Sequence, residues 1–134
     1  MIPSTTAFLS QDFEIEELSS KTYRMDLDGD CVRGFCDGLE ALKQSIFRIL
    51  NTERYQYIIY SWNYGIETMD LYGQPITYVC PELERRITEA LLVDSRILSV
   101  TDFEHDIAVK GEVHTTFKVH TIYGDIDAKK GVNI

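Results

Sequence analysis

Within residues 81–103, the spacing of apolar residues switches from that of a helix to that of a strand. Up to about Asp94, apolar side chains recur every three or four residues among glutamates and arginines, which is typical of an amphipathic helix. Pro81 suits the first turn of this helix, and Ile97–Phe103 is the predicted strand after it. Because a helix with one apolar stripe must bury it against other elements, this step predicts a layered domain. The stripe consists of Leu83, Ile87, Ala90 and Leu91.

A second amphipathic helix is predicted between Asp37 and Asn51. Asp37 is a good N-cap, and Glu40 lies three residues later, where its side chain can close a capping box. Burying the apolar face of such a helix contributes roughly 1.5–3 kcal/mol for each large side chain. That face carries Leu39, Leu42, Ile46, Ile49 and Leu50.

The C-terminal third alternates apolar and polar residues, which is the period of a strand with one buried face. Lys110-Gly111 is a predicted hairpin turn, and a strand over 112–123 follows it. Residues 124–134 keep the alternation with little to pack, so they form either a last edge strand or an arm awaiting a partner. The face of the 112–123 strand suited to the core carries Val113, Thr115, Phe117, Val119, Thr121 and Tyr123.

The first 35 residues are predicted to form an arm and a hairpin. Residues 1–12 have the pattern of a loose arm, and Phe13–Glu16 alternates like a short edge strand. Asp28-Gly29 separates two extended runs and indicates a hairpin whose turn positions have positive φ. The same cluster is a poor calcium loop, because its glycine is at the fourth position and Asp37, rather than a glutamate, is at the twelfth.

The segment Arg54–Gly65 is rich in tyrosine. Alternation across Tyr55–Trp62 predicts a strand that is partly covered on both faces, closed by a turn at its end. The chain has eight tyrosines and one tryptophan, and both residue types are enriched at protein interfaces. Trp62 and Tyr64 are therefore candidate interaction residues, and the alternative is that these aromatics pack in the core.

Together these patterns predict one α+β domain, with two main helices packed on a mostly antiparallel sheet that has hairpins and an extended C-terminal strand. A chain of 134 residues fits one domain and can bury a sizeable core without disulfides. The expected parts are an N-terminal arm and hairpin (1–35), a core (36–123) and a C-terminal strand or arm (124–134).

The net charge of −9 is uneven, since residues 1–40 alone account for −6. An acidic chain repels phosphate backbones, so we expect no nucleic-acid partner. No apolar run is long enough to span a membrane and the N-terminus lacks signal-peptide features, so we expect a cytoplasmic protein without membrane contact. The acidic N-terminal end is either a solvated segment or a docking site for a basic partner.

The three cysteines, Cys31, Cys36 and Cys80, are expected to be free thiols, because an odd count in a chain that is not secreted argues against disulfides. A zinc site would need His114 or His120 as well, since the chain has no second cysteine pair. We expect neither a metal nor a cofactor.

No catalytic motif stands out in the sequence. There is no Gly-x-Ser-x-Gly elbow, and no glycine-rich loop precedes a helix in a phosphate-binding pattern. Glu53, Glu67 and Asp70 could supply the two carboxyls of a glycoside hydrolase, although a chain with 22 acids offers such pairs by chance. The sequence favours a protein that is not an enzyme, and a lysozyme-like peptidoglycan hydrolase is the alternative.

Several segments agree in order and spacing with a known family. Over roughly residues 36–134 the chain resembles the XkdS-like proteins of PBSX-type defective prophages. These are similar to the wider baseplate wedge or sheath-initiator family of contractile phage tails, R-type bacteriocins and type VI secretion systems. The matching segments are Tyr60–Gly65, Leu83–Leu92, Asp94–Ile97 and His120–Ile126.

The resemblance implies a structural baseplate component of a contractile tail, as a small subunit in a sixfold ring. Its implied partners are the helical core bundle of the baseplate wedge proteins and the sheath protein, with the tail tube or hub as a further candidate. The subunit would be made in the cytoplasm of the bacterial host and end in the tail baseplate. Its C-terminal strands would imitate a sheath subunit, so that the first sheath ring grows from it by strand addition. Candidate residues there are Tyr123, Asp125 and Ile126.

The wider family carries a Glu-Pro-Arg motif between the last helix and the next strand, and Asp94, Ser95 and Arg96 match it here. The arginine is kept, the aspartate is a shorter acid and the proline is absent. Arginine presents a rigid fork of donors that suits a partner's carboxylates or helix carbonyls. The alternative is that Arg96 satisfies the free carbonyls of the helix before it.

Overall fold

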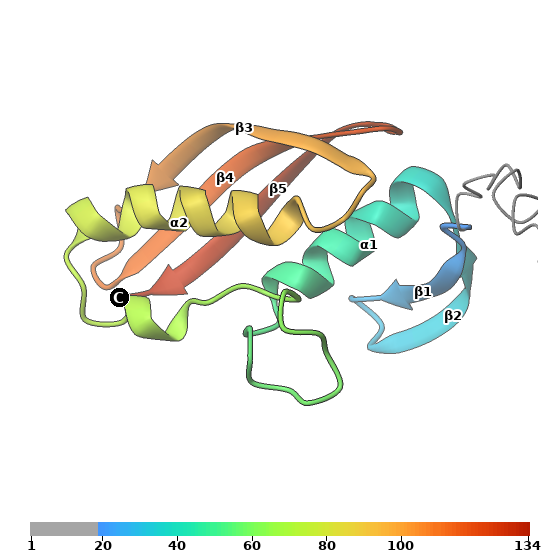
Figure 1. Cartoon of the computed structure of the whole chain (residues 1–134), viewed down its shortest axis with the longest axis horizontal. Helices are drawn as coiled ribbons and strands as arrows, with labels where there is room; N and C mark the ends of the chain where they lie inside the picture. The colour runs from blue at the N-terminus through green and yellow to red at the C-terminus, as the bar shows by residue number, and fades with distance from the viewer. Residues whose placement is uncertain (1–18) are drawn as a thin grey trace, which may run out of the picture.

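The computed structural model describes residues 19–134, and Figure 1 shows how its elements are arranged. The small domain combines two helices with two antiparallel sheets, which confirms the expected α+β class. The predicted arm at 1–12 and strand at 13–16 lie outside the described residues. The elements are, in order, β1 (Thr22–Asp26), β2 (Cys31–Cys36), α1 (Gly38–Leu50), the 3-10 turn η2 (Met69–Leu71), α2 (Ile76–Leu91), β3 (Ile97–Asp106), β4 (Glu112–Thr121) and β5 (Gly124–Asn133).

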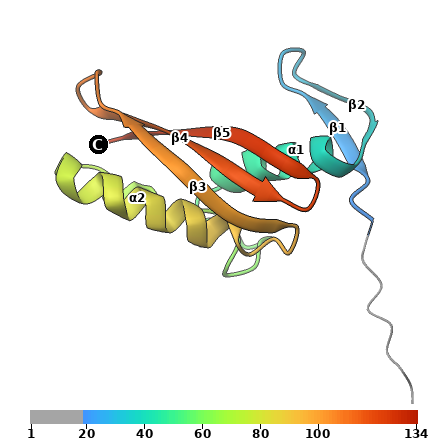
Figure 2. The ribbon, with the colours of Figure 1, turned by 90° about the horizontal axis from the view of Figure 1, so that it is seen from above.

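The main sheet is an antiparallel meander with β4 between β3 and β5. β4 and β5 pair without interruption from Glu112↔Asn133 to Thr121↔Gly124. The β3–β4 ladder instead has two irregularities, and the second lies between Thr101 and Glu104. Figure 2 shows α2 running along one face of this sheet. Residues 124–134 therefore form an edge strand within the subunit rather than a separate arm.

The core lies between that face of the sheet and the two helices. The alternation predicted for β4 is confirmed, since its odd-numbered residues from Val113 to Thr121 are buried, whereas Tyr123 lies in the turn beyond β4 and is partly exposed. The buried Thr115 hydroxyl is not left without a partner, because His105 Nδ1 lies 2.8 Å from it. The helices contribute the fully buried residues Leu42, Val79, Leu83, Ile87 and Leu91.

Helix α1 begins and ends close to its predicted bounds. Asp37 is the N-cap, and its carboxylate accepts a hydrogen bond from the Gly38 N–H at 2.7 Å. The expected capping box differs, because Glu40 turns to Arg24 on β1, with Oε2 3.0 Å from Nη2. Glu40 thus links the helix to the hairpin instead of closing the helix end.

Helix α2 begins at Ile76, five residues before the predicted start at Pro81. Pro81 has no N–H to offer the carbonyl of Thr77, but Thr77 is exposed and water can satisfy it. The extra first turn is held in place by Val79, which is fully buried in the core. Tertiary packing has therefore outweighed the local preference of proline for a helix start.

The prediction of a strand at Tyr55–Trp62 is wrong, because this segment consists of turns and bends. Two backbone hydrogen bonds join the ends of this segment. The Arg54 N–H donates to Ile66 O at 3.1 Å, and the Ile66 N–H donates to Thr52 O at 3.0 Å. A strand needs a ladder partner along its length, and this closure leaves none. We call residues 54–65 the aromatic loop.

The β1–β2 hairpin is confirmed, but its turn is longer than predicted. Asp26 pairs with Cys31, so four residues connect the strands, and only Asp30 among them has positive φ, at 48°. The Asp26 carboxylate accepts hydrogen bonds from the N–H groups of Asp28 and Gly29, which closes the turn from the side chain. No helix in the described part of the chain is long and apolar enough to cross a membrane.

Candidate interaction surfaces

Residues Asp94–Arg96, which we call the Arg96 corner, connect α2 to β3. Arg96 and Asp94 form a bidentate pair, with Nε 2.9 Å from Oδ1 and Nη2 2.6 Å from Oδ2. The backbone N–H of Arg96 also donates to Asp94 Oδ1, at 3.0 Å. The guanidinium is thus held by its own neighbour in the chain, whereas the sequence suggested a partner protein or the carbonyls of the preceding helix.

The remaining donors of Arg96 reach two distant segments. Nη1 donates to Ser20 Oγ at 3.2 Å, and Nη2 lies 3.5 Å from Ser45 Oγ on α1. Ser20 Oγ is in turn 2.7 Å from the phenol oxygen of Tyr123, in the turn between β4 and β5. The backbone adds a further link, since the Ile122 N–H donates to Arg96 O at 3.1 Å. The corner therefore joins the N-terminal segment, α1 and the last hairpin.

These contacts keep both Asp94 and Arg96 ionised. Burial by itself would raise the pKa of Asp94, but the hydrogen bonds from the side chain and backbone of Arg96 outweigh it and hold that pKa below 3.8. The same side-chain bond raises the pKa of Arg96, so both groups stay ionised. Ser95 is exposed between them, so it is the corner residue whose side chain faces solvent.

The outer edge of β5 is the second surface. The Ile134 N–H donates to Gly111 O at 2.8 Å, and hydrogen-bonded pairs alternate along an antiparallel ladder. Even-numbered residues of β5 therefore direct their N–H and C=O groups to β4. Odd-numbered residues direct theirs to the outer edge, where no strand of the described chain pairs with them. These are Asp125, Asp127, Lys129, Gly131 and Asn133.

Two of the predicted interaction residues lie on β5 and differ in exposure. The exposed Asp125 carboxylate lies 2.7 Å from His120 Nδ1, and His120 Nε2 lies 2.7 Å from Thr101 Oγ1, which ties the three strands together on the outer face. Ile126 is only 4% exposed and packs in the core opposite Val119. Its side chain stabilises the subunit, and its backbone faces β4.

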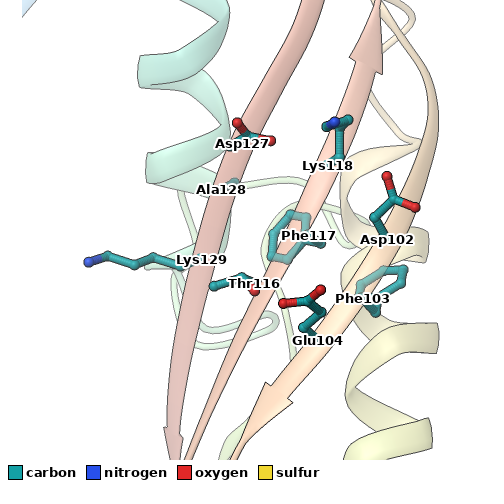
Figure 3. Close-up of a pocket in the computed structure, with 9 residues that line it drawn as sticks. All are labelled: Asp102, Phe103, Glu104, Thr116, Phe117, Lys118, Asp127, Ala128 and Lys129. Atoms are coloured by element: carbon teal, nitrogen blue, oxygen red, sulfur yellow. The ribbon is translucent and has the colours of Figure 1, made fainter.

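The opposite edge of the sheet, β3, is irregular. Thr101 pairs with Lys118 and Glu104 with Thr116, so two residues of β3 oppose the single residue Phe117. Asp102, one of the two, has φ 57°, a conformation uncommon outside glycine. Figure 3 shows this part of the sheet, with Asp102 and Phe103 on β3 beside Phe117. The two edges of the sheet are therefore unlike: β5 is regular and β3 is bulged.

The aromatic loop is pinned at its base by one side chain that the sequence patterns did not single out. Arg54 donates from Nε to Gly65 O at 3.2 Å and from Nη1 to Glu89 on α2 at 3.0 Å, and its Nη2 lies 3.5 Å from Asn63 O. Its side chain is mostly buried. An arginine that precedes a run of twelve residues without charge was the available signal, because such a charge needs a partner outside the run.

Aromatic rings of the loop pack on one another, and Tyr64 also packs against the core. Tyr60 stacks on Tyr64 with ring centroids 4.5 Å apart, and Tyr55 meets Trp62 edge to face at 6.0 Å. Trp62 is 84% exposed, whereas Tyr64 is half-buried, and burial raises the pKa of its phenol. The two candidate residues thus lie in one loop, with Trp62 on its surface and Tyr64 nearer its base.

Two of the three acids considered for hydrolysis, Glu53 and Asp70, are held by structural contacts. The Glu53 carboxylate accepts bonds from the N–H groups of Thr68 and Met69 at the start of η2. Asp70 forms a bidentate pair with Arg86, whose hydrogen bond lowers the pKa of Asp70. A general acid for glycoside cleavage needs the opposite shift, to a raised pKa.

The cysteines and the other ligating side chains form no shared centre. Cys31, Cys36 and Cys80 are free thiols, as expected, and burial raises the pKa of Cys80. Within residues 19–134, no group of three or more His, Cys, Asp or Glu side chains comes together in a metal-binding arrangement.

Comparison with known proteins gives the context for these surfaces. The family model described as contractile injection system sheath initiator matches residues 17–124. The chain belongs to the sheath-initiator family. It is also 38% identical over 128 residues to the phage-like element PBSX protein XkdS of Bacillus subtilis (strain 168), covering 90% of this chain and 89% of that protein.

Membership gives this sheath initiator a structural role in a contractile tail and implies contacts with sheath or baseplate components. The matched region ends at Gly124, where β5 begins, and it includes the Arg96 corner and the aromatic loop. The resemblance read from the sequence is thereby confirmed at the level of the family.

Proposed function

We propose that this chain joins the baseplate wedge of a contractile tail and starts the first sheath ring by accepting a strand at the outer edge of β5. The regular edge of β5 carries the proposal, since five residues present N–H and C=O groups outward over a strand of ten residues without a bulge. Such an edge pairs readily with another chain, and the main-chain bonds supply affinity with little demand on side-chain identity. The proposal differs from strand donation by a free arm, because β5 is already paired with β4.

The partners follow from this arrangement. A strand of the sheath protein would extend the sheet beyond β5, with Asp125 on the same outer face. The wedge proteins, through their helical core bundle, would meet the subunit at the Arg96 corner, where Ser95 is exposed beside the Asp94–Arg96 pair. Tyr123 lies next to this corner, so wedge binding and sheath binding would meet at the β4–β5 turn. Six copies would form a ring, in contact with the tail tube or hub.

The role proposed here is structural and not enzymatic. The family is one of sheath initiators, and two of the carboxylates considered for hydrolysis are engaged elsewhere: Glu53 binds backbone N–H groups and Asp70 binds Arg86. The subunit would be made in the host cytoplasm and would end in the baseplate of the particle.

The test uses two neighbouring proline variants in cells that produce tails. Lys129→Pro removes an N–H that points to the outer edge, so the β4–β5 ladder keeps its bonds. Lys130→Pro removes an N–H that points to β4 and should weaken the fold. Lys129→Ala controls for loss of the lysine side chain. We expect Lys129→Pro to fold as well as Lys129→Ala, within about 1 kcal/mol, because proline is tolerated at the outward positions of an edge strand.

Electron microscopy of the particles reads the outcome. Lys129→Pro should give tubes with baseplates but without sheath, while Lys129→Ala should give normal tails. Normal sheathed tails from a folded Lys129→Pro protein would rule out strand addition at this edge. A version ending after Tyr123 also lacks the buried Ile126 and Val132, so it serves as the control for loss of the fold.

A further inference from the structure

The base of the aromatic loop is rigid. The two backbone bonds to Ile66 and Thr52 and the three contacts of the Arg54 side chain close it at both ends. Gly65 has φ 92°, and a Cβ at this position would lie 2.5 Å from Thr52 O, so only glycine fits where the loop returns. The loop is therefore held in one shape by contacts that lie below its tip.

The tip carries large apolar side chains that the subunit leaves uncovered. Ile58 is fully exposed and Ile59 is 85% exposed. At roughly 150–250 Å² per aromatic side chain, the exposed parts of the four loop aromatics add about 360–600 Å². A stable interface covers about 800 Å² on each partner, so these four aromatics alone would supply roughly half to three quarters of one side. The four are Tyr55, Tyr57, Tyr60 and Trp62.

The loop carries no charge between Tyr55 and Tyr64, in a chain whose net charge is −9. Two hollows elsewhere on the described surface, of about 690 and 570 Å³, are lined by several charged side chains each. Placing the loop in either of them on a second copy would remove those charges from water against a loop that offers them no charged partner. A membrane surface is also a poor match, because the loop lacks the lysines and arginines that attract anionic lipid.

From these observations we propose that the aromatic loop is a preformed plug that inserts into an uncharged, apolar groove on a different protein. Ile58, Ile59 and Trp62 would fill the groove. The phenol groups of Tyr55, Tyr57 and Tyr60 and the indole N–H of Trp62 would reach polar groups at its rim, which matches residue types that combine an apolar body with a polar end. Because the base is already fixed, binding requires little further ordering of the loop.

The inference is independent of strand addition at β5 and has its own test. A photo-reactive benzoylphenylalanine placed at Ile58 is activated by light in producing cells, and the adduct is mapped by mass spectrometry. The matched control places the same residue at Tyr72, an exposed aromatic outside the loop. We expect position 58 to give at least tenfold more adduct than position 72, on an uncharged apolar segment of another protein. Replacing Ile59 and Trp62 with serine should remove that adduct.

Other results would overturn the inference. An adduct on a second copy of this chain would mean self-association, and purified protein that sediments as a dimer only while Ile58 and Ile59 are intact would mean the same. An adduct on lipid would mean a membrane contact. Equal adduct yields at positions 58 and 72, from a protein whose melting temperature matches that of the wild type, would mean that the loop has no partner.

Discussion

The phenol oxygen of Tyr123 lies 2.7 Å from Ser20 Oγ, which joins residues 103 positions apart in the chain. Ser20 also accepts a hydrogen bond from Arg96, so one serine hydroxyl connects this guanidinium to the last hairpin. An arginine shared by three segments couples their stabilities, because losing it leaves several polar groups without partners at once.

Replacing Arg96 with alanine should lower the free energy of unfolding by about 2–3 kcal/mol, because the mostly buried Asp94 carboxylate loses its partner. Arg96→Lys should recover part of this, since lysine keeps the charge but cannot form the bidentate pair. Urea unfolding followed by circular dichroism measures both. A change below about 0.5 kcal/mol for Arg96→Ala, the usual size for a surface substitution, would contradict the role given to the corner.

Asp94 should make stability depend on acid pH. Its pKa is lowered in the folded state, so its contribution is complete above the unfolded value of 3.8 and is lost as the pH falls through the lower, folded value. The stability difference between wild type and Asp94→Asn should thus be constant near neutral pH and shrink below about pH 4. Urea unfolding of both proteins at a series of pH values measures it. A difference that grows toward acid pH would mean that the folded pKa is raised.

Gly65→Ala should cost about 3 kcal/mol, because the added Cβ meets Thr52 O at 2.5 Å and the residue must keep a positive φ. Gly73→Ala is the matched control: φ there is 80° but no atom lies within 4 Å of the added Cβ, so only about 1 kcal/mol is expected. Thermal unfolding distinguishes the two. Equal losses would show that Gly65 is needed for its φ alone and not for the close approach.

Purified protein should not hydrolyse peptidoglycan, and Asp70→Asn should affect only stability. Asp70 is exposed on one side, so we expect a loss of no more than about 1 kcal/mol when its pair with Arg86 is weakened. Turbidity of a cell-wall suspension reports hydrolysis, and thermal unfolding reports stability. Clearing of the suspension by wild type but not by Asp70→Asn would restore the lysozyme-like alternative.

The elements that the sequence predicted well are those whose pattern is set by one buried face. β4 alternates strictly because one side packs on the helices, and α1 carries both a capping aspartate and a complete apolar stripe. In these elements the local preferences and the core demand the same structure, so the pattern alone is enough.

The elements that were mispredicted are those where a distant contact decides. Alternation in Tyr55–Trp62 indicated a strand, but Arg54 and Gly65 close the segment into a loop, and no pattern within the run shows this. The early start of α2 depends on Val79 reaching the core. Of the expected interaction residues, the register of β5 buries Ile126, and Asp94, two positions away, holds the Arg96 guanidinium, which also reaches Ser20 and Ser45. Their contacts with a partner protein stay a prediction.

The bulge at Asp102 makes the β3 edge of the sheet different from the β5 edge. One edge can be continued by another strand, while the other is kinked where a flat neighbour would have to lie. If each subunit accepts a strand at its β5 edge and none at its β3 edge, successive subunits are added on the same side. Under the proposed strand addition, the bulge at Asp102 and Phe103 leaves β5 as the edge that accepts a strand, so each subunit would add its partner on one defined side.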